Sequence, residues 1–225
     1  MSPDRYFIKD GYRSRAEPEY FEDSGSAIAY QPDVYVEAGR VAERIGARRI
    51  IDLGCGSGTK LVELHPRFEV IGIDYGPNVR AARERHPFAT WLEHDLGTGC
   101  ALPLEAAQLE GSVLVCADVI EHLVRPETLL RKLRAALARA EGVVLSTPER
   151  DLTRGPDHFG PPPNACHVRE WTIGELAALL AAEGFDHRWL GLTRSWDQTP
   201  HLHTILAFLF PDGARLCAAT GGLCV

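Results

Sequence analysis

Several features that define other protein classes are missing from this sequence of 225 residues. It has no apolar run of about 18 residues, the length at which a segment becomes a candidate membrane-spanning helix. Its first residues, MSPDRYFIKDGYRSR, are charged and aromatic and lack the apolar core of a secretory signal peptide. The sequence therefore predicts no membrane contact, and we expect a cytoplasmic protein.

An excess of basic residues is also missing. The 31 Asp and Glu residues outnumber the 24 Lys and Arg residues, which gives a formal net charge of −7. Proteins that bind nucleic acids usually present a basic face. The balance therefore predicts a small-molecule partner and no nucleic acid, whereas nothing in the sequence indicates an oligomeric state.

Closely paired cysteines are absent as well, because no C-x-x-C motif occurs. The six cysteines are widely spaced: Cys55, Cys100, Cys116, Cys166, Cys217 and Cys224. Such spacing is typical of reduced thiols in a cytosolic chain and not of a zinc site. We expect no bound metal.

Apolar runs and helical periodicities alternate along most of the chain. Seven short runs rich in apolar residues predict strands: Arg49–Leu53, Glu69–Ile73, Ala89–Glu93, Ser112–Ala117, Gly142–Ser146, His187–Leu192 and Thr204–Phe210. Helical spacing and end signals predict helices: Asp33–Ile45, Lys60–Leu64, Pro77–His86, Pro126–Ala140 and Thr172–Glu183. The alternation predicts a doubly wound α/β domain, and the last two strands, with no helix between them, should pair antiparallel.

Outside this core we expect less regular structure. Residues 1–45 are predicted to form an N-terminal arm and helix, 46–213 the main domain and 214–225 a tail. The aromatic residues of the arm suit a lid over a ring-bearing substrate, although simple packing on the domain is the alternative. A Pro-rich loop is expected from Thr147 to Pro163, after the fifth strand.

The sharpest local signal is IIDLGCGSG, in which the first strand runs into Gly54, Gly56 and Gly58. Glycines at such a turn allow a ligand to approach the backbone closely, and the N–H groups that follow favour a carboxylate. The next two strands end near Asp74 and Asp95. Acidic side chains there can accept hydrogen bonds from the ribose and the adenine amino group of a nucleoside.

Two other interpretations of these residues compete with a nucleoside site: ordinary turns without a ligand, and a site for a different ligand. Glycine and aspartate are common in turns, but three such positions in register with successive strands favour a ligand. A nicotinamide dinucleotide is the rival ligand, and its G-x-G-x-x-G motif requires glycine where this chain has Thr59.

With these motifs the chain resembles the class I S-adenosylmethionine-dependent methyltransferases over residues 50–210. The segment Asp118–Leu123, DVIEHL, is similar to the motif of the small-molecule branch related to ubiquinone biosynthesis. The resemblance implies a seven-stranded, Rossmann-like sheet of order 3-2-1-4-5-7-6 with strand 7 antiparallel. It also implies S-adenosylmethionine as cofactor, held by these residues: Asp52, Gly54, Cys55, Gly56, Gly58, Asp74, Tyr75, Asp95, Leu96, Asp118 and Val119.

Three histidines are candidates for a general base in the transfer of a methyl group to an oxygen or nitrogen atom. His122 follows the fourth strand, and His158 and His167 lie after the fifth, so all three belong to the ligand edge of the sheet. Purely structural or solvated histidines are the alternative. A nicotinamide-dependent oxidoreductase and a non-catalytic cofactor-binding subunit remain the other hypotheses for the whole chain.

Overall fold

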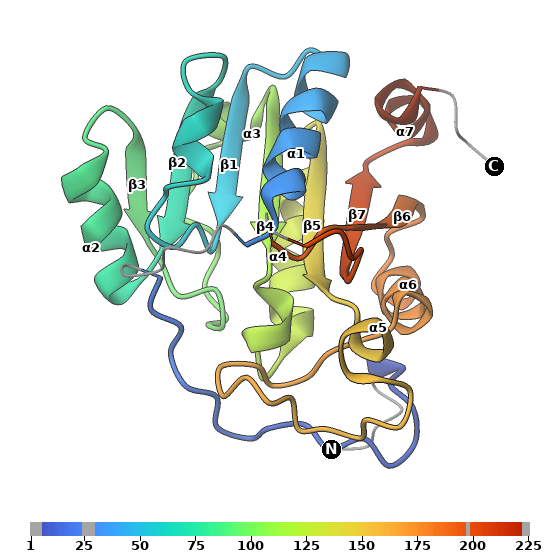
Figure 1. The fold of residues 1–225 in the computed structure, drawn as a ribbon. Coiled ribbons are helices and arrows are strands. Elements are labelled where there is room, and N and C mark those ends of the chain that lie inside the picture. Colours follow the sequence, from blue (N-terminus) through green and yellow to red (C-terminus); the bar gives the residue numbers. More distant parts are fainter. Residues whose placement is uncertain (1–5, 24–29, 197–198, 222–225) are drawn as a thin grey trace.

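The computed structural model describes residues 6–23, 30–196 and 199–221. A single seven-stranded sheet of order β3-β2-β1-β4-β5-β7-β6 forms its centre (Figure 1). The strands are β1 (Arg49–Leu53), β2 (Glu69–Asp74), β3 (Thr90–Glu93), β4 (Ser112–Ala117), β5 (Gly142–Pro148), β6 (His187–Thr193) and β7 (Thr204–Phe210). β7 runs antiparallel to both β5 and β6, whereas β1 to β5 are parallel. The predicted fold class and the antiparallel ending are confirmed.

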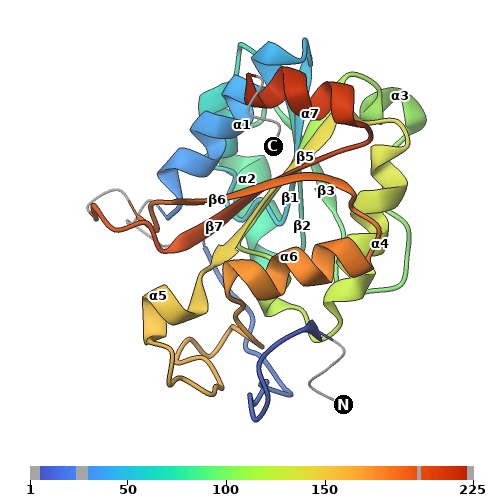
Figure 2. The same ribbon diagram turned by 90° about the vertical axis from the view of Figure 1, so that its right-hand side faces the viewer.

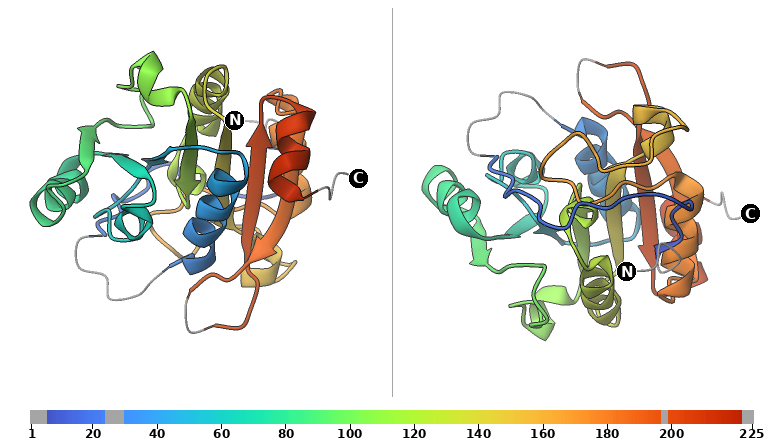
Figure 3. Two further views of the ribbon diagram at one scale, coloured as in Figure 1. Left: turned by 90° about the horizontal axis from the view of Figure 1, so that it is seen from above. Right: turned by 90° about the horizontal axis from the view of Figure 1, so that it is seen from below.

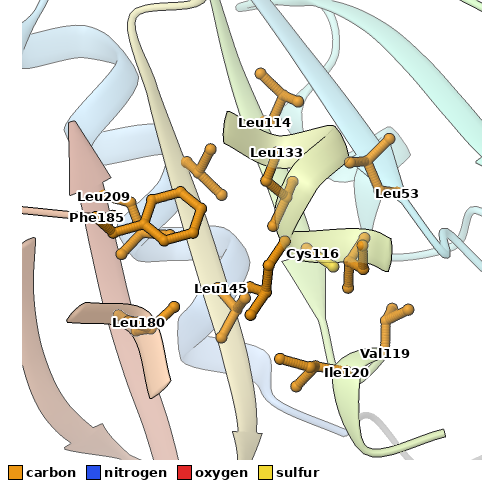
Figure 4. Packing of buried hydrophobic residues seen from close by; sticks show 14 of the residues in the cluster. Leu53, Leu114, Cys116, Val119, Ile120, Leu133, Leu145, Leu180, Phe185 and Leu209 are labelled. Carbon is orange, nitrogen blue, oxygen red and sulfur yellow. The ribbon is translucent and has the colours of Figure 1, made fainter. Parts of the chain in front are cut away.

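Helices cover both faces of this sheet (Figure 3). One face packs against α1 (Pro32–Arg44), α2 (Gly76–Arg85) and α7 (Gly213–Thr220), and the other against α4 (Pro126–Leu137) and α6 (Ile173–Ala182). Strand residues alternate between the two cores: Leu114 and Cys116 of β4 belong to the α4 side, as Figure 4 shows, and Val113 to the α1 side. Burial on both faces explains the nearly continuous apolar strands.

The structure differs from three local expectations. The predicted loop from Thr147 to Pro163 begins within β5, which extends to Pro148, and contains the helix α5 (Arg150–Arg154). The helix expected at 60–64 is a short 3-10 helix, η2 (Leu61–Leu64), and the chain has the further short helices α3 (Ala106–Leu109) and η3 (Ile120–His122). The segment expected to form a tail includes most of α7, whose Ala219 lies buried in the core.

The cysteines divide into two groups. Cys55, Cys100, Cys116 and Cys166 are free thiols, as expected of a reduced chain. Cys217, in α7, is disulfide-bonded, so the expectation of reduced thiols is wrong there. Cys224 lies outside the described residues.

The carboxyl ends of the parallel strands meet at one edge of the sheet, at the bottom of Figure 1. Two segments cross this edge, the arm residues 6–23 and the chain from 155 to 171 (Figures 1 and 2). They are joined by backbone hydrogen bonds, among them from the amide of Arg13 to the carbonyl of Phe159, at 2.9 Å, and from Arg15 to Val168, at 2.8 Å. No helix in the described parts of the chain is long and apolar enough to cross a membrane.

The glycine turn after β1 leads to a test of the fold. Gly54 and Gly46 both have positive φ, +82° and +71°, but only at Gly54 would an added Cβ collide with a neighbour, Val119 Cγ2. We expect Gly46→Ala to lower the free energy of unfolding by ~1–2 kcal/mol, the cost of the left-handed conformation. Gly54→Ala should cost a further ~1–3 kcal/mol because the core beside it must shift. Urea unfolding measures both, and equal losses would contradict the close approach of the turn to Val119.

Candidate active site

A cavity of about 510 Å³ opens at the carboxyl edge of the sheet. Most of the predicted site residues line it: Gly54, Cys55, Gly56, Asp74, Tyr75, Asp95, Leu96, Asp118, Val119, His122 and His167. Three others, Asp52, Gly58 and His158, are not part of its lining. Most of the predicted cofactor positions and two of the three predicted histidines therefore share one cavity.

The glycine turn and the end of β2 form a single hydrogen-bonded unit. The amides of Gly54 and Cys55 both donate to the carbonyl of Ile73, at 2.8 and 3.1 Å. The carboxylate of Asp74 accepts from the amide of Gly56 at 2.7 Å and from that of Tyr75 at 2.7 Å. Burial raises the pKa of Asp74 to about 6, although these backbone bonds act in the opposite direction.

A second carboxylate lies beneath the turn. Asp52, in β1, is completely buried, and its Oδ2 accepts a hydrogen bond of 2.8 Å from the hydroxyl of Tyr35. Its Oδ1 has no hydrogen-bond partner among the described residues. Burial raises the pKa of Asp52 to about 7, while the Tyr35 hydroxyl and the nearby Lys60 lower it. An unpaired oxygen in a buried carboxyl group is costly unless a donor or cation arrives.

The N-terminal arm lies across this end of the cavity. The hydroxyl of Tyr20 donates to the carbonyl of Tyr75 at 2.7 Å, and the two rings contact edge to face. Asp23 accepts from the amide and the hydroxyl of Ser57, at 3.1 and 2.9 Å, and so lies directly against the glycine turn. Residues 18–21 and 23 line the cavity, which agrees with a covering role, but whether the arm opens stays a prediction.

Histidines form the other end of the cavity. His122, at the end of η3, donates from Nδ1 to the carbonyl of Cys166 at 3.0 Å, and its ring lies 4.7 Å from that of His167. His167 Nδ1 lies 2.8 Å from Glu170 Oε1, and Arg154 binds the same carboxylate at 3.1 and 3.2 Å. Burial, followed by the neighbouring His167, lowers the pKa of His122 to about 3. His122 is therefore a neutral imidazole at pH 7.

His158 lies elsewhere. Its ring packs edge-on against Tyr12 of the arm, at a centroid distance of 6.4 Å, and its Nε2 is buried without a hydrogen-bond partner in the described parts of the chain. The structure thus separates His158 from the pair formed by His122 and His167.

Several residues of the site do not follow from the sequence patterns. Glu121 belongs to the DVIEHL segment, but nothing in that segment indicates that its side chain is fully buried beside His122. Glu170 follows His167 by three residues, a spacing that could have suggested a partner for the imidazole. Asp23 has no sequence signal, because it reaches the glycine turn only through the path of the arm.

Comparisons with known proteins place the chain in a family. The model of the family described as "Methyltransferase domain" matches residues 16–188. A probable S-adenosylmethionine-dependent methyltransferase of Mycobacterium tuberculosis is 34% identical over 149 residues, which are 65% of this chain and 52% of that protein. A ubiquinone biosynthesis O-methyltransferase of Cereibacter sphaeroides is 33% identical over 113 residues, 49% of this chain and 44% of the relative. The chain spans about half the length of these curated relatives.

A solved structure shows the same fold. The small RNA methyltransferase HEN1 superposes with a TM-score of 0.62 over 87% of this chain and 27% of that one, at 19% identity. Identity at this level supports the fold alone. The family match, which covers most of the chain, sets aside the nicotinamide alternative. The chain belongs to the family of methyltransferase domains, enzymes whose cofactor is S-adenosylmethionine.

Proposed function

We propose that the chain transfers the methyl group of S-adenosylmethionine to an oxygen or nitrogen atom of a small molecule, such as a secondary metabolite or a sugar-type acceptor. The observation that supports this most directly is that one cavity joins the glycine turn and Asp74 at one end to His122 and His167 at the other. A cofactor and an acceptor can therefore meet in it. When bound, the cofactor supplies a methyl group activated by a positively charged sulfur.

The residues of the turn fit the cofactor. An added Cβ would collide with Val119 at Gly54 and with Asp23 at Gly56, so both positions leave room only for backbone beside the cavity. Asp74 would accept the ribose hydroxyls, and Asp95 and Leu96 would flank the adenine. The unpartnered Oδ1 of Asp52 is buried beneath the turn and would be nearest the amino-acid part of the cofactor.

The histidines suit the acceptor. With Nδ1 of His122 donating to Cys166 O and Nδ1 of His167 beside Glu170, the Nε2 atom of each ring is left to receive a hydrogen bond or a proton. Because the pKa of His122 is near 3, we assign His122 the role of aligning the acceptor. We assign His167 the role of receiving the proton of the acceptor. Holding acceptor and methyl donor in one orientation supplies much of the acceleration in such a displacement.

A small acceptor agrees with the net charge of −7, because a polyanion would be repelled. Turnover with a panel of hydroxyl and amine acceptors, with a short RNA included, tests this choice. Methylation of the RNA alone would overturn it. Binding of the cofactor without methylation of any acceptor would instead favour a non-catalytic cofactor-binding subunit.

Cofactor binding should depend on pH through Asp74. A carboxylate can accept from both ribose hydroxyls only when ionised, and the pKa of Asp74 is about 6. Lowering the pH from 7 to 5 should therefore raise the Kd for adenosine roughly tenfold, one tenfold step per pH unit below the pKa. Calorimetry with adenosine isolates this effect because adenosine lacks the amino-acid part that we assign to the side of Asp52. Asp74→Asn should bind weakly with no such pH dependence, and an unchanged wild-type Kd at pH 5 would contradict the assignment.

Substitution of the histidines tests whether they act on the acceptor and not in binding of the cofactor. We expect His122→Ala and His167→Ala each to lower kcat by roughly a hundredfold or more while the Kd for S-adenosylhomocysteine stays the same. The exposed His187 on β6 provides the control, since His187→Ala should change neither quantity. His158→Ala should also retain kcat, because that ring lies outside the cavity lining. If His158→Ala lowered kcat as much as His167→Ala, the assignment of the proton acceptor to His167 would be contradicted.

A further inference from the structure

Three side chains at the histidine end of the cavity present metal-ligand atoms to one another. One ligand atom each of Glu121, His122 and His167 lies within 4.8 Å of the other two. We propose that these residues bind a divalent metal ion and that this ion holds the methyl acceptor. The site departs from the sequence-based expectation of no bound metal.

The two imidazoles are already oriented as metal ligands usually are. A ligating histidine binds through one ring nitrogen while the other donates to a carbonyl or carboxylate, which fixes the tautomer. Here Nδ1 of His122 donates to the Cys166 carbonyl, and Nδ1 of His167 lies 2.8 Å from the Glu170 carboxylate. Nε2 of both rings therefore remains for the ion, and Arg154 also binds Glu170 and holds it in place.

Glu121 supplies an independent observation. Its side chain is completely buried, its Oε2 accepts a hydrogen bond of 2.9 Å from Thr147, and its Oε1 has no partner among the described residues. A buried carboxyl oxygen without a donor loses its hydration uncompensated. A cation between Oε1 and the two Nε2 atoms would satisfy all three.

The donor set limits the kind of ion. Two imidazoles and one carboxylate suit Zn²⁺, Mn²⁺, Fe²⁺ or Co²⁺ and leave coordination positions open. Because His122 and His167 line the cavity, the open positions face the space for the acceptor. An acceptor with two adjacent oxygens, such as vicinal hydroxyls, can occupy two of them at once.

This acceptor class rests on the proposed function. A hydroxyl bound to the ion becomes more acidic, and its proton leaves to water, so the bound oxygen is presented as an anion without a protein base. With the ion in place, His122 and His167 act as its ligands, whereas without it His167 remains the proton acceptor. The two roles can be separated by measuring metal binding directly.

The test is titration of the full chain, freed of metal by a chelator, with Mn²⁺ and Zn²⁺ in a calorimeter and with Co²⁺ in a spectrophotometer. We expect one ion per chain and Co²⁺ absorption bands typical of nitrogen and oxygen ligands. Glu121→Gln, which keeps the shape and removes the charge, should weaken binding by about tenfold or more, as should loss of the supporting carboxylate in Glu170→Gln. His201→Ala is the control, because His201 and His203 stack 5.3 Å apart and could bind an ion adventitiously.

Binding that His201→Ala abolishes and Glu121→Gln leaves unchanged would overturn the proposal, as would no binding at all. Titration of each variant with S-adenosylhomocysteine shows that the fold survives, since the ligand uses the opposite end of the cavity. A chain that binds S-adenosylhomocysteine but no metal refutes the metal site and leaves the proposed function intact. A chain that binds metal but not S-adenosylhomocysteine refutes the function instead. Turnover of a vicinal diol should fall after chelation and return with Mn²⁺.

Discussion

The hydrogen bond from the amide of Gly56 to the carboxylate of Asp74 is the interaction on which the site depends. It joins the turn after β1 to the end of β2, and the amides of Gly54 and Cys55 reinforce the junction through Ile73. Because the turn is held there, its backbone forms one wall of the cavity. An added Cβ would collide with Val119 at Gly54 and with Asp23 at Gly56. The sheet order then brings the ends of β3 and β4 to either side of the same junction.

The cavity has two chemically different ends. Around the turn, the buried carboxyl groups of Asp52 and Asp74 have raised pKa values and can be stabilised by donors and positive charge. At the other end, His122 and His167 are fixed by bonds to Cys166 and Glu170. The arm and the segment from 155 to 171 bond to each other. Both cross the carboxyl edge of the sheet, as Figure 3 shows from below. Closure over an active site excludes water, so these two segments suit the role of a cover in the proposed transfer.

Local sequence patterns predict those parts of the fold that depend mainly on residues close together in the chain. Apolar runs predict all seven strands, and end signals predict the helix that begins at Thr172. In the structure Thr172 and Glu175 make both reciprocal capping bonds at the start of α6. The turn at 54–58 and Asp74 were found because glycine and aspartate follow strands in register. The sequence patterns do not indicate Asp23, Glu170 or the burial of Glu121, because these features depend on tertiary contacts of the arm and of the segment from 155 to 171. His158 was predicted from its place in that loop, and only the path of the chain shows that its ring turns toward Tyr12.

A crystal structure of the chain with S-adenosylhomocysteine at saturating concentration would decide whether this cavity is the active site. We expect the ribose hydroxyls to bind the carboxylate of Asp74, the adenine to lie beside Tyr75 and Leu96, and the sulfur to point toward His122 and His167. A nucleoside bound outside this cavity, or a ribose that does not contact Asp74, would contradict the assignment.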